Sequence, residues 1–510
     1  MKKNIVWIII SIFVLLLQVA AETFTAVIVF RLDLLPEKYY ALFGAVLLFP
    51  ILVTALLLFV RGKKPVGKLR RIISCLLALA VVCGCALLSK VATDVYTTLH
   101  AVTDVELNQT ADDGEIYIFV RKDDPKTELS TMGNYRFSIV ENYDVFYTEQ
   151  MISLIQEEIQ KYPILTKYEK FSDMADALFS HNTDALIMNG AAVFMLMEEE
   201  GYEDFLKNAR ILHTTPIASL EQPEEPKQPE TPEQPEIPKG PIDKAPFIMY
   251  ISGSDSRSTT LKTKRSDVNI LVVVNPVTKQ ILLLNTPRDY YVPNPVGDGQ
   301  MDKLTNCGVY GVKNSVKTLA NFYGVDIAYY AQINFTGFEK LIDAVGGVTV
   351  YNDKAFSVGE HFFNEGEVEL DGVRALAFAR DRYHQSGGDR GRGKNQMKII
   401  TALIEKMTTG TTIISGYSEI MAGIKGMFRT SITTKEISTL VKMQLGDMAS
   451  WNIQSFSVSG TGGSEESYSS PGHKSYVMLP NEADVSHAKY LMSLIFAGHK
   501  LTAQDMKVPK

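Results

Sequence analysis

The stretch VNILVVVNPVTKQILLLN, residues 268–285, contains two apolar runs of strand length. Further runs of this kind are PFIMYISG at 246–253, AYYAQINF at 328–335 and GVTVYN at 347–352. Segments with the 3.6-residue period of helices lie between and after them, the last at Glu482–Phe496. A strand that is apolar along its whole length needs cover on both faces. Residues 245–510 are therefore predicted to form a three-layer α/β/α sandwich.

The first ninety residues contain three more apolar runs, Ile5–Ala21, Tyr39–Val60 and Ile72–Leu88. Each has about 17 to 22 residues, enough at ~1.5 Å rise per residue to cross a hydrocarbon core of ~30 Å. Two lysines precede the first run, as in a signal peptide, but no cleavage site is followed by a soluble start. We expect residues 1–91 to form a membrane anchor of three transmembrane helices.

The charges between the runs indicate how the anchor is oriented. The segment Arg61–Arg71, RGKKPVGKLRR, carries six basic and no acidic residues, whereas Arg31–Lys38 carries two of each sign. The positive-inside rule places the first segment and Met1 in the cytoplasm. The protein is thus expected to be a multi-pass protein of the cell membrane whose large C-terminal domains are extracellular.

A proline-rich segment divides the external part. Seven prolines recur at every third position from Pro223 to Pro241, with six Glu and two Lys between Glu221 and Pro241. This pattern is typical of an extended polyproline II spacer. The linker is placed at residues 221–244. Before it, residues 92–220 alternate strand-like and helix-like segments, which predicts a small α/β accessory domain without a cluster of chemically active side chains.

The composition excludes several classes of protein. Four cysteines in 510 residues, three of them within one apolar run, exclude a disulfide framework. The fourth, Cys307, is interpreted as a structural residue rather than a nucleophile, because nothing near it in the sequence would lower its pKa. A net charge of -7 argues against general affinity for nucleic acid.

Arginine and aspartate recur together where the predicted strands end. The motifs are SGSDSRS at 252–258, LKTKRSD at 261–267, TPRD at 286–289 and ARDRYHQSGGDRGRGKNQ at 379–396. Ligands of α/β sheets collect at the carboxyl ends of strands. Guanidinium groups bind phosphate in a bidentate manner, and carboxylates among them suit a divalent cation shared with phosphate oxygens. The pattern predicts a phosphate site with a magnesium ion.

Taken together, these motifs and the strand-helix segment INFTGFEKLIDAVGGV at 333–348 resemble the LytR-CpsA-Psr family. The three spans, accessory domain and linker resemble its CpsA branch from streptococcal capsule loci. The resemblance implies a cell envelope of the Gram-positive type and a polyisoprenyl-phosphate glycopolymer phosphotransferase. Such an enzyme moves capsular polysaccharide or a related glycopolymer from an undecaprenyl pyrophosphate carrier to peptidoglycan, with Mg²⁺ or Mn²⁺ as cofactor.

The resemblance also implies roles for individual residues. The metal-binding carboxylates would be Asp255 and Asp267. Contacts to the lipid pyrophosphate would come from Arg265, Arg288, Arg380, Arg382 and Gln396. Catalytic or supporting roles would fall to Asp267, Arg265, Asp389 and Arg392. The family often has Arg-Gln-Gln after this last element, where this chain has Asn395, Gln396 and Met397, so Lys394 or Arg390 is the candidate for the missing contact.

A rival hypothesis is a regulator of capsule biosynthesis that acts through the basic segment 61–71 or through partner proteins of capsule synthesis. Eleven residues without a recognition helix can contact phosphates but cannot read bases, so we do not expect sequence-specific DNA binding. The same charges are accounted for by membrane topology and anionic lipids. The enzyme is therefore the preferred hypothesis.

The orientation can be tested with reporter fusions. A reporter fused after residue 95 should be active outside the cell, and one fused at Gly67 should be active inside, because the positive segment stays in the cytoplasm. The measurement is alkaline phosphatase and fluorescent-protein activity in paired fusions. The reverse pattern would remove the basis for an external enzyme.

Overall fold

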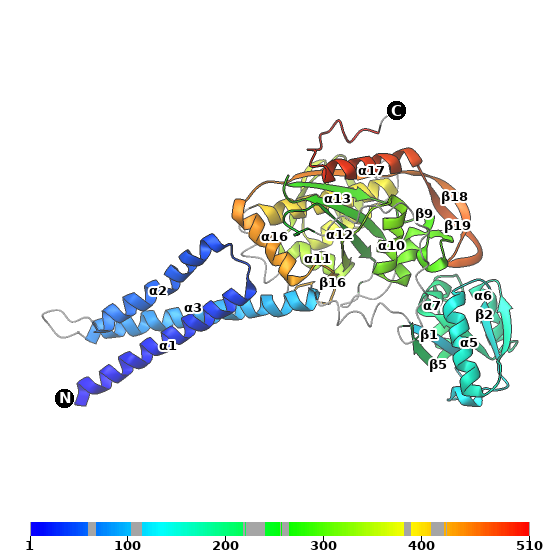
Figure 1. The fold of residues 1–510 in the computed structure, drawn as a ribbon, viewed down its shortest axis with the longest axis horizontal. Coiled ribbons are helices and arrows are strands. Elements are labelled where there is room, and N and C mark those ends of the chain that lie inside the picture. Colours follow the sequence, from blue (N-terminus) through cyan, green and yellow to red (C-terminus); the bar gives the residue numbers. More distant parts are fainter. Residues whose placement is uncertain are drawn as a thin grey trace.

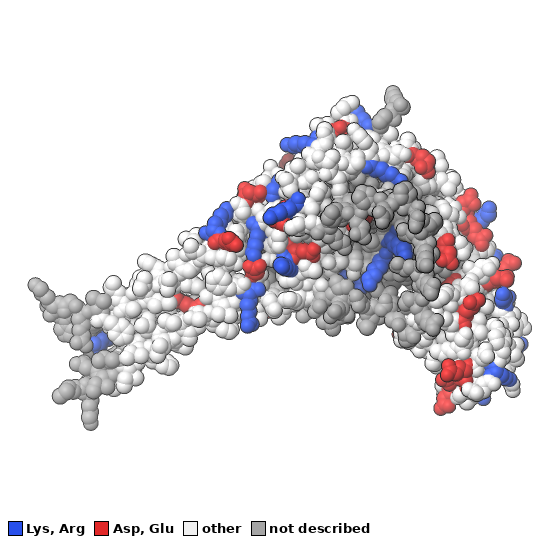
Figure 2. All heavy atoms as spheres, viewed as in Figure 1, with Lys and Arg blue, Asp and Glu red and all other residues white. Residues whose placement is uncertain are grey.

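The computed structural model describes residues 2–59, 68–103, 115–217, 220, 240–255, 257, 265–381, 389–409, 423–424 and 426–508. Three long helices at the N-terminus form an arm that projects from the C-terminal domain, and the accessory domain lies on the other side of that domain (Figure 1). Each helix is long and apolar enough to cross a membrane. Figure 2 shows few charged side chains along the described part of this arm. The expectation of three long apolar helices is confirmed. They are α1 (Lys2–Leu32), α2 (Glu37–Phe59) and α3 (Lys68–Thr103).

The third helix is longer than its apolar run and contacts the C-terminal domain. It continues from Leu88 to Thr103, and its buried Val95 and Leu99 pack near Ile437 of α16 (Thr434–Asp447). The turn after α1 reaches the same helix, because Lys442 Nζ lies 2.5 Å from Asp33 Oδ1. These contacts fix how the C-terminal domain sits on the anchor.

The accessory domain contains a five-stranded sheet with the order β3-β2-β4-β1-β5. Strands β2, β3 and β4 run parallel, and β1 is antiparallel to β4 and β5. Apolar residues pack on both faces of this sheet. Its strands are β1 (Glu115–Arg121), β2 (Arg136–Val140), β3 (Ile164–Tyr168), β4 (Ala185–Asn189) and β5 (Ala209–Pro216), and its helices are η1 (Leu129–Thr131), α5 (Val145–Ile159), α6 (Phe171–Phe179), α7 (Gly190–Met197) and α8 (Phe205–Asn208).

The C-terminal domain is built on a six-stranded sheet with the order β16-β11-β6-β7-β8-β17. Strand β6 is parallel to β11 and antiparallel to β7, and β8 is antiparallel to β7 and parallel to β17. Strands β6, β8, β11 and β17 therefore end at the same edge. The strands are β6 (Phe247–Ser254), β7 (Val268–Asn275), β8 (Gln280–Asn285), β11 (Tyr329–Asn334), β16 (Phe428–Thr430) and β17 (Asn452–Ser457).

Helices cover both faces of this sheet, as its apolar strands require. Alternate residues of β7, such as Leu271 and Val273, pack on one face against α10 (Val312–Tyr323) and α17 (Glu482–Phe496). The intervening residues of β7, such as Ile270 and Val272, point to the other face and pack against α13 (Asp389–Thr408) and α16. The α/β/α sandwich is confirmed.

Other elements lie outside the three layers. The predicted strand GVTVYN forms as β12, but it pairs with β15 in a separate two-stranded sheet. The long hairpin of β18 and β19 was not predicted, because its apolar run is limited to four residues, 476–479, in β19. These elements are α9 (Leu304–Cys307), η3 (Pro295–Gly297), η4 (Gly308–Tyr310), α11 (Phe335–Ala344), α12 (Gly372–Arg380), β9 (Tyr291–Pro293), β10 (Met301–Lys303), β12 (Val348–Asn352), β13 (Phe356–Val358), β14 (His361–Phe363), β15 (Gly366–Leu370), β18 (Gly460–Ser467) and β19 (Ser470–Pro480).

Candidate functional site

Two of the charged motifs meet where β6 ends and β7 begins. Gly253 pairs with Val268 across the two strands, and the amide of Asp267 donates to the carbonyl of Gly253 at 2.8 Å. A side chain at Gly253 would come within 2.9 Å of Val268, so this close approach needs glycine. Asp255, two residues beyond Gly253, therefore lies at the same end of the strand pair as Asp267.

An ion pair joins the next motif to this end. The guanidinium of Arg288, which follows β8, donates from Nη1 to Asp267 Oδ1 at 2.5 Å. Its Nε also lies 3.6 Å from Asp289 Oδ2. The side chains of Arg288 and Asp267 are only 26% and 14% exposed to solvent. Partial burial strengthens such a pair compared with one at the open surface.

The glycine-rich motif reaches the end of β8 through α13. A side chain at Gly393 would lie 2.3 Å from Nδ2 of Asn285, the last residue of β8. Only glycine lets the first turns of the helix approach this closely. Arg392 beside it is buried, and Gln396 is partly buried one turn further along α13. The helix start, where backbone amides favour anions, is thereby placed at the carboxyl end of β8.

Arg380 lies at the end of a third parallel strand. It closes α12, and its guanidinium lies 5.0 Å from the centroid of the Phe335 ring, which follows directly on β11. This side chain is exposed and can turn toward a ligand. The structure thus brings Asp255, Asp267, Arg288, Arg380 and Arg392 to one edge of the sheet, which we call the charged edge.

Three predicted residues have no described side chain directed to the charged edge. Arg382 lies outside the described residues, and of Asp389 only the backbone, at the start of α13, is described. Arg265 lies just before β7 in the chain. Its side chain points to the accessory domain, where Nη1 lies 3.1 Å from Glu198 Oε2.

A lysine that the motifs did not predict also lies at the charged edge. Lys303 ends the three-residue strand β10 and is half-buried. Burial lowers its pKa, and Arg265 and Arg288 lower it further, while Asp289 and Asp302 oppose the shift. Its ammonium therefore shares the field of the arginines and suits a bound phosphate. No strand-end motif marks this residue; only its position in space does.

The carboxylates at this edge fit a divalent cation in part. Among the described residues, no group of three His, Cys, Asp or Glu side chains could hold a metal ion alone. Asp255 and Asp267 nevertheless offer hard oxygen ligands at one end of the β6–β7 pair. Mg²⁺ is commonly held by one or two carboxylates together with substrate phosphates. The residues present fit a cation that arrives with a phosphate ligand.

The cysteine nearest to the charged edge does not suit nucleophilic chemistry. Cys307 is fully buried, and burial raises the pKa of its thiol well above the ordinary value. Its Sγ lies 3.6 Å from the carbonyl oxygen of Lys303, to which it donates. A thiol of raised pKa is a poor nucleophile, so the structural interpretation agrees with the geometry.

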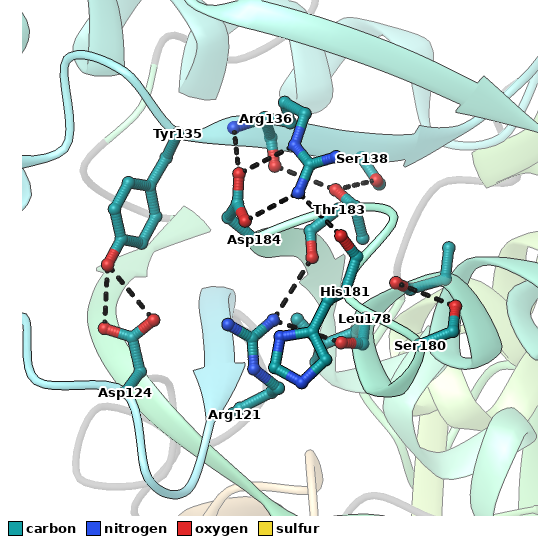
Figure 3. A network of polar contacts seen from close by, with 11 residues as sticks. Arg121, Asp124, Tyr135, Arg136, Ser138, Leu178, Ser180, His181, Thr183 and Asp184 are labelled. Carbon is teal, nitrogen blue, oxygen red and sulfur yellow. Dashed lines mark hydrogen bonds and ion pairs between the residues drawn. The ribbon is translucent and has the colours of Figure 1, made fainter.

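The accessory domain contains a dense network of hydrogen bonds and ion pairs (Figure 3). Arg136 makes a two-pronged ion pair with Asp184, with both nitrogen–oxygen distances at 2.9 Å. Arg121 donates to the carbonyls of Leu178 and Thr183. These bonds tie β1 and β2 to the segment before β4. These contacts hold the strands of the domain together, and the absence of chemistry from this domain stays a prediction.

With this geometry established, comparison with known proteins assigns the chain to a class. The model of the LytR_cpsA_psr family matches residues 215–489, more than half of the chain. The chain therefore belongs to the LytR_cpsA_psr family. The matched segment contains every residue of the charged edge.

Several curated relatives carry the name polyisoprenyl-teichoic acid--peptidoglycan teichoic acid transferase TagU. The protein from Enterococcus faecalis is 32% identical over 200 residues, which are 39% of this chain and 65% of the relative. The protein from Bacillus cereus is 35% identical over 198 residues, which are 39% of this chain and 64% of the relative. The chain spans slightly less than two thirds of the length of these relatives.

Solved structures also match the chain. The crystal structure of B. subtilis TagV has 27% sequence identity, covers 50% of this chain and 98% of its own, and gives a TM-score of 0.43. The crystal structure of B. subtilis TagU has 25% identity, covers 52% of this chain and 99% of its own, and gives a TM-score of 0.39.

The close approach of α13 to β8 is testable by substitution. Gly393→Ala should destabilise the protein by about 1–3 kcal/mol, because the new methyl group forces Asn285 or the helix to move. Thermal unfolding of the purified protein measures the loss. Gly446→Ala on α16 is the matched control, since nothing lies within 4 Å of its added atom. Equal melting temperatures for the two variants would show that α13 does not need this glycine.

Proposed function

We propose that this protein is a membrane-anchored extracellular transferase. It moves capsular polysaccharide or a related glycopolymer from an undecaprenyl pyrophosphate carrier to peptidoglycan. The observation that carries the proposal is the convergence of Arg288, Arg380, Lys303 and Asp267 at one edge of the sheet. Family membership and the teichoic acid transferase activity in the names of the relatives support it.

The proposed reaction is a phosphoryl transfer. The oxygen of a peptidoglycan hydroxyl attacks the phosphorus next to the sugar, the bond to the bridging oxygen breaks, and undecaprenyl phosphate leaves. A phosphodiester then links polymer and wall. Such reactions depend mainly on positioning and on neutralising charge, so no covalent nucleophile is needed. The hydroxyl proton needs an acceptor, and Asp255, Asp267 and Asp289 are the described carboxylates at the charged edge.

Each side chain of the charged edge would have its own role in binding the pyrophosphate or the metal ion. Arg288 and Arg380 would bind the two phosphates through their guanidinium forks, and Lys303 would add a compact charge. The start of α13 would present backbone amides, with Arg392 supporting it from beneath. Asp255 and Asp267 would hold Mg²⁺ or Mn²⁺, which would neutralise charge on the transferred group. Arg265, Arg382, Gln396 and Asp389 keep the roles expected of them within this proposal, Arg265 as a further ligand of the pyrophosphate.

The division of the chain is part of the same proposal. Residues 1–91 would anchor the protein, 92–220 would form the accessory domain, 221–244 the linker and 245–510 the transferase domain. The proline-rich part of the linker, 221–239, lies outside the described residues. Capsule-synthesis proteins at the membrane are candidate partners, because the polymer must be delivered on its lipid carrier.

Substitutions at the ion pair between Arg288 and Asp267 test the mechanism. Asp267→Asn should abolish divalent-dependent turnover without unfolding the protein. Arg288→Lys should lower the rate by roughly 30- to 1000-fold, because an ammonium cannot replace a bidentate fork in the transition state. The measurement is polymer joined to peptidoglycan and undecaprenyl phosphate released by the purified full-length protein. Arg374→Lys is the matched control, since Arg374 lies on α12 but donates to Phe362.

The regulator hypothesis makes the opposite prediction for the basic segment. Neutralising its six basic residues, in a chain whose topology is maintained by other means, should leave transfer unchanged. If that variant lost wall-attached polymer while Asp267→Asn and Arg288→Lys retained it, the enzyme proposal would be wrong.

A further inference from the structure

The accessory domain contacts one of the arginines expected to bind phosphate. Arg265 Nη1 lies 3.1 Å from Glu198 Oε2, and its Nη2 lies 3.8 Å from Met195 Sδ. The guanidinium also lies 5.7 Å from the centroid of the Phe194 ring. These three residues belong to α7 or cap its end. Both terminal nitrogens of Arg265 are thus engaged by one segment of the other domain.

This contact is supported by an aromatic interface between the two domains. The rings of Tyr143 and Tyr468 stack with centroids 5.1 Å apart, and Tyr143 Oη lies 3.1 Å from Tyr310 Oη. Val309 and Tyr468 of the C-terminal domain belong to the same apolar cluster as Phe171 of the accessory domain. In Figure 1, α7 lies on the side of the accessory domain that faces the C-terminal domain. The contact with Arg265 therefore belongs to an extended packed surface.

Local helix chemistry does not explain a carboxylate at Glu198. This residue is the C-cap of α7, where the helix dipole disfavours negative charge. Its ion pair with Arg265 is half-exposed, and pairs of this kind add little stability. Arg265 Nε is buried and has no hydrogen-bond partner among the described residues. Within the described part of the chain, the guanidinium thus retains a donor without a hydrogen-bond partner, while a carboxylate occupies one of its two terminal nitrogens.

Glu198 can affect phosphate binding in two opposite ways: it can repel the phosphate, or it can hold the Arg265 guanidinium in place for it. The repulsion is the larger effect. A phosphate bound to Arg265 would face the Glu198 carboxylate at short range, and the two negative charges would repel each other. Glu198 also holds the Arg265 guanidinium in place, but this effect is smaller than the repulsion, because a half-exposed ion pair is weak. Removing the charge of Glu198 should therefore strengthen anion binding.

We infer that Glu198 is an internal anion that competes with the pyrophosphate of the carrier for Arg265. The accessory domain then acts as a gate on the transferase site. The carrier binds fully only when α7 releases this arginine. The inference rests on the proposed function, because it takes Arg265 as a phosphate ligand.

The test measures the affinity of the full-length protein, in detergent, for inorganic pyrophosphate at a fixed Mg²⁺ concentration by titration calorimetry. Glu198→Gln removes the charge with little change in shape and should tighten binding by roughly 3- to 30-fold. Glu200→Gln is the matched control, because Glu200 is also exposed and lies two residues further along the chain. It should bind like the unaltered protein. Equal melting temperatures would show that the interface is intact.

The outcomes separate the two ideas. If the unaltered protein binds pyrophosphate and Glu198→Gln binds no more tightly than Glu200→Gln, the gate is wrong and the proposed function stands. If neither the unaltered protein nor Glu198→Gln binds pyrophosphate, the phosphate site fails and the gate fails with it. Binding that appears or tightens only in Glu198→Gln supports the gate.

Discussion

The ion pair between Arg288 and Asp267 is the interaction on which the charged edge depends. Cations gathered at one end of a sheet repel each other, and the lowered pKa of Lys303, caused first by burial and then by Arg265 and Arg288, reflects this cost. Asp267 and Asp289 offset the repulsion while no anion is bound. This constraint explains why Arg288 has Asp267 beside it in space and Asp289 beside it in the sequence. A dianionic or trianionic ligand can then take over part of the role of the carboxylates.

The scaffold makes this gathering of charge possible through strand direction and close packing. Strands β6, β8 and β11 run the same way, so the segments after them meet. Gly253 and Gly393 allow β7 and α13 to approach where a side chain would collide. The contacts of α3 and Asp33 with α16 fix the orientation of the C-terminal domain relative to the three N-terminal helices. A substrate carried by a membrane lipid would need such an orientation.

Much of the fold could be predicted from the sequence, because buried strands and amphipathic helices leave a clear pattern. The strand VNILVVVN and the helix Glu482–Phe496 form where expected. The hairpin at 460–480 is rich in glycine and serine, and its single run of four apolar residues, 476–479, is too short to indicate two paired strands. Lys303 was missed because a single lysine after a three-residue strand carries no periodic signal. The pairing of Arg265 with Glu198 joins residues 67 positions apart and depends on how two domains pack, which neither local sequence contains.

The central claim is that the charged edge binds a lipid pyrophosphate. Native mass spectrometry of the full-length protein, purified in mild detergent from cells that make the polymer, tests it most directly. The account predicts a co-purified mass that corresponds to an undecaprenyl pyrophosphate species, and its loss in Arg288→Lys but not in Arg374→Lys. The absence of such a lipid from the unaltered protein, or its equal retention in both variants, would contradict the account.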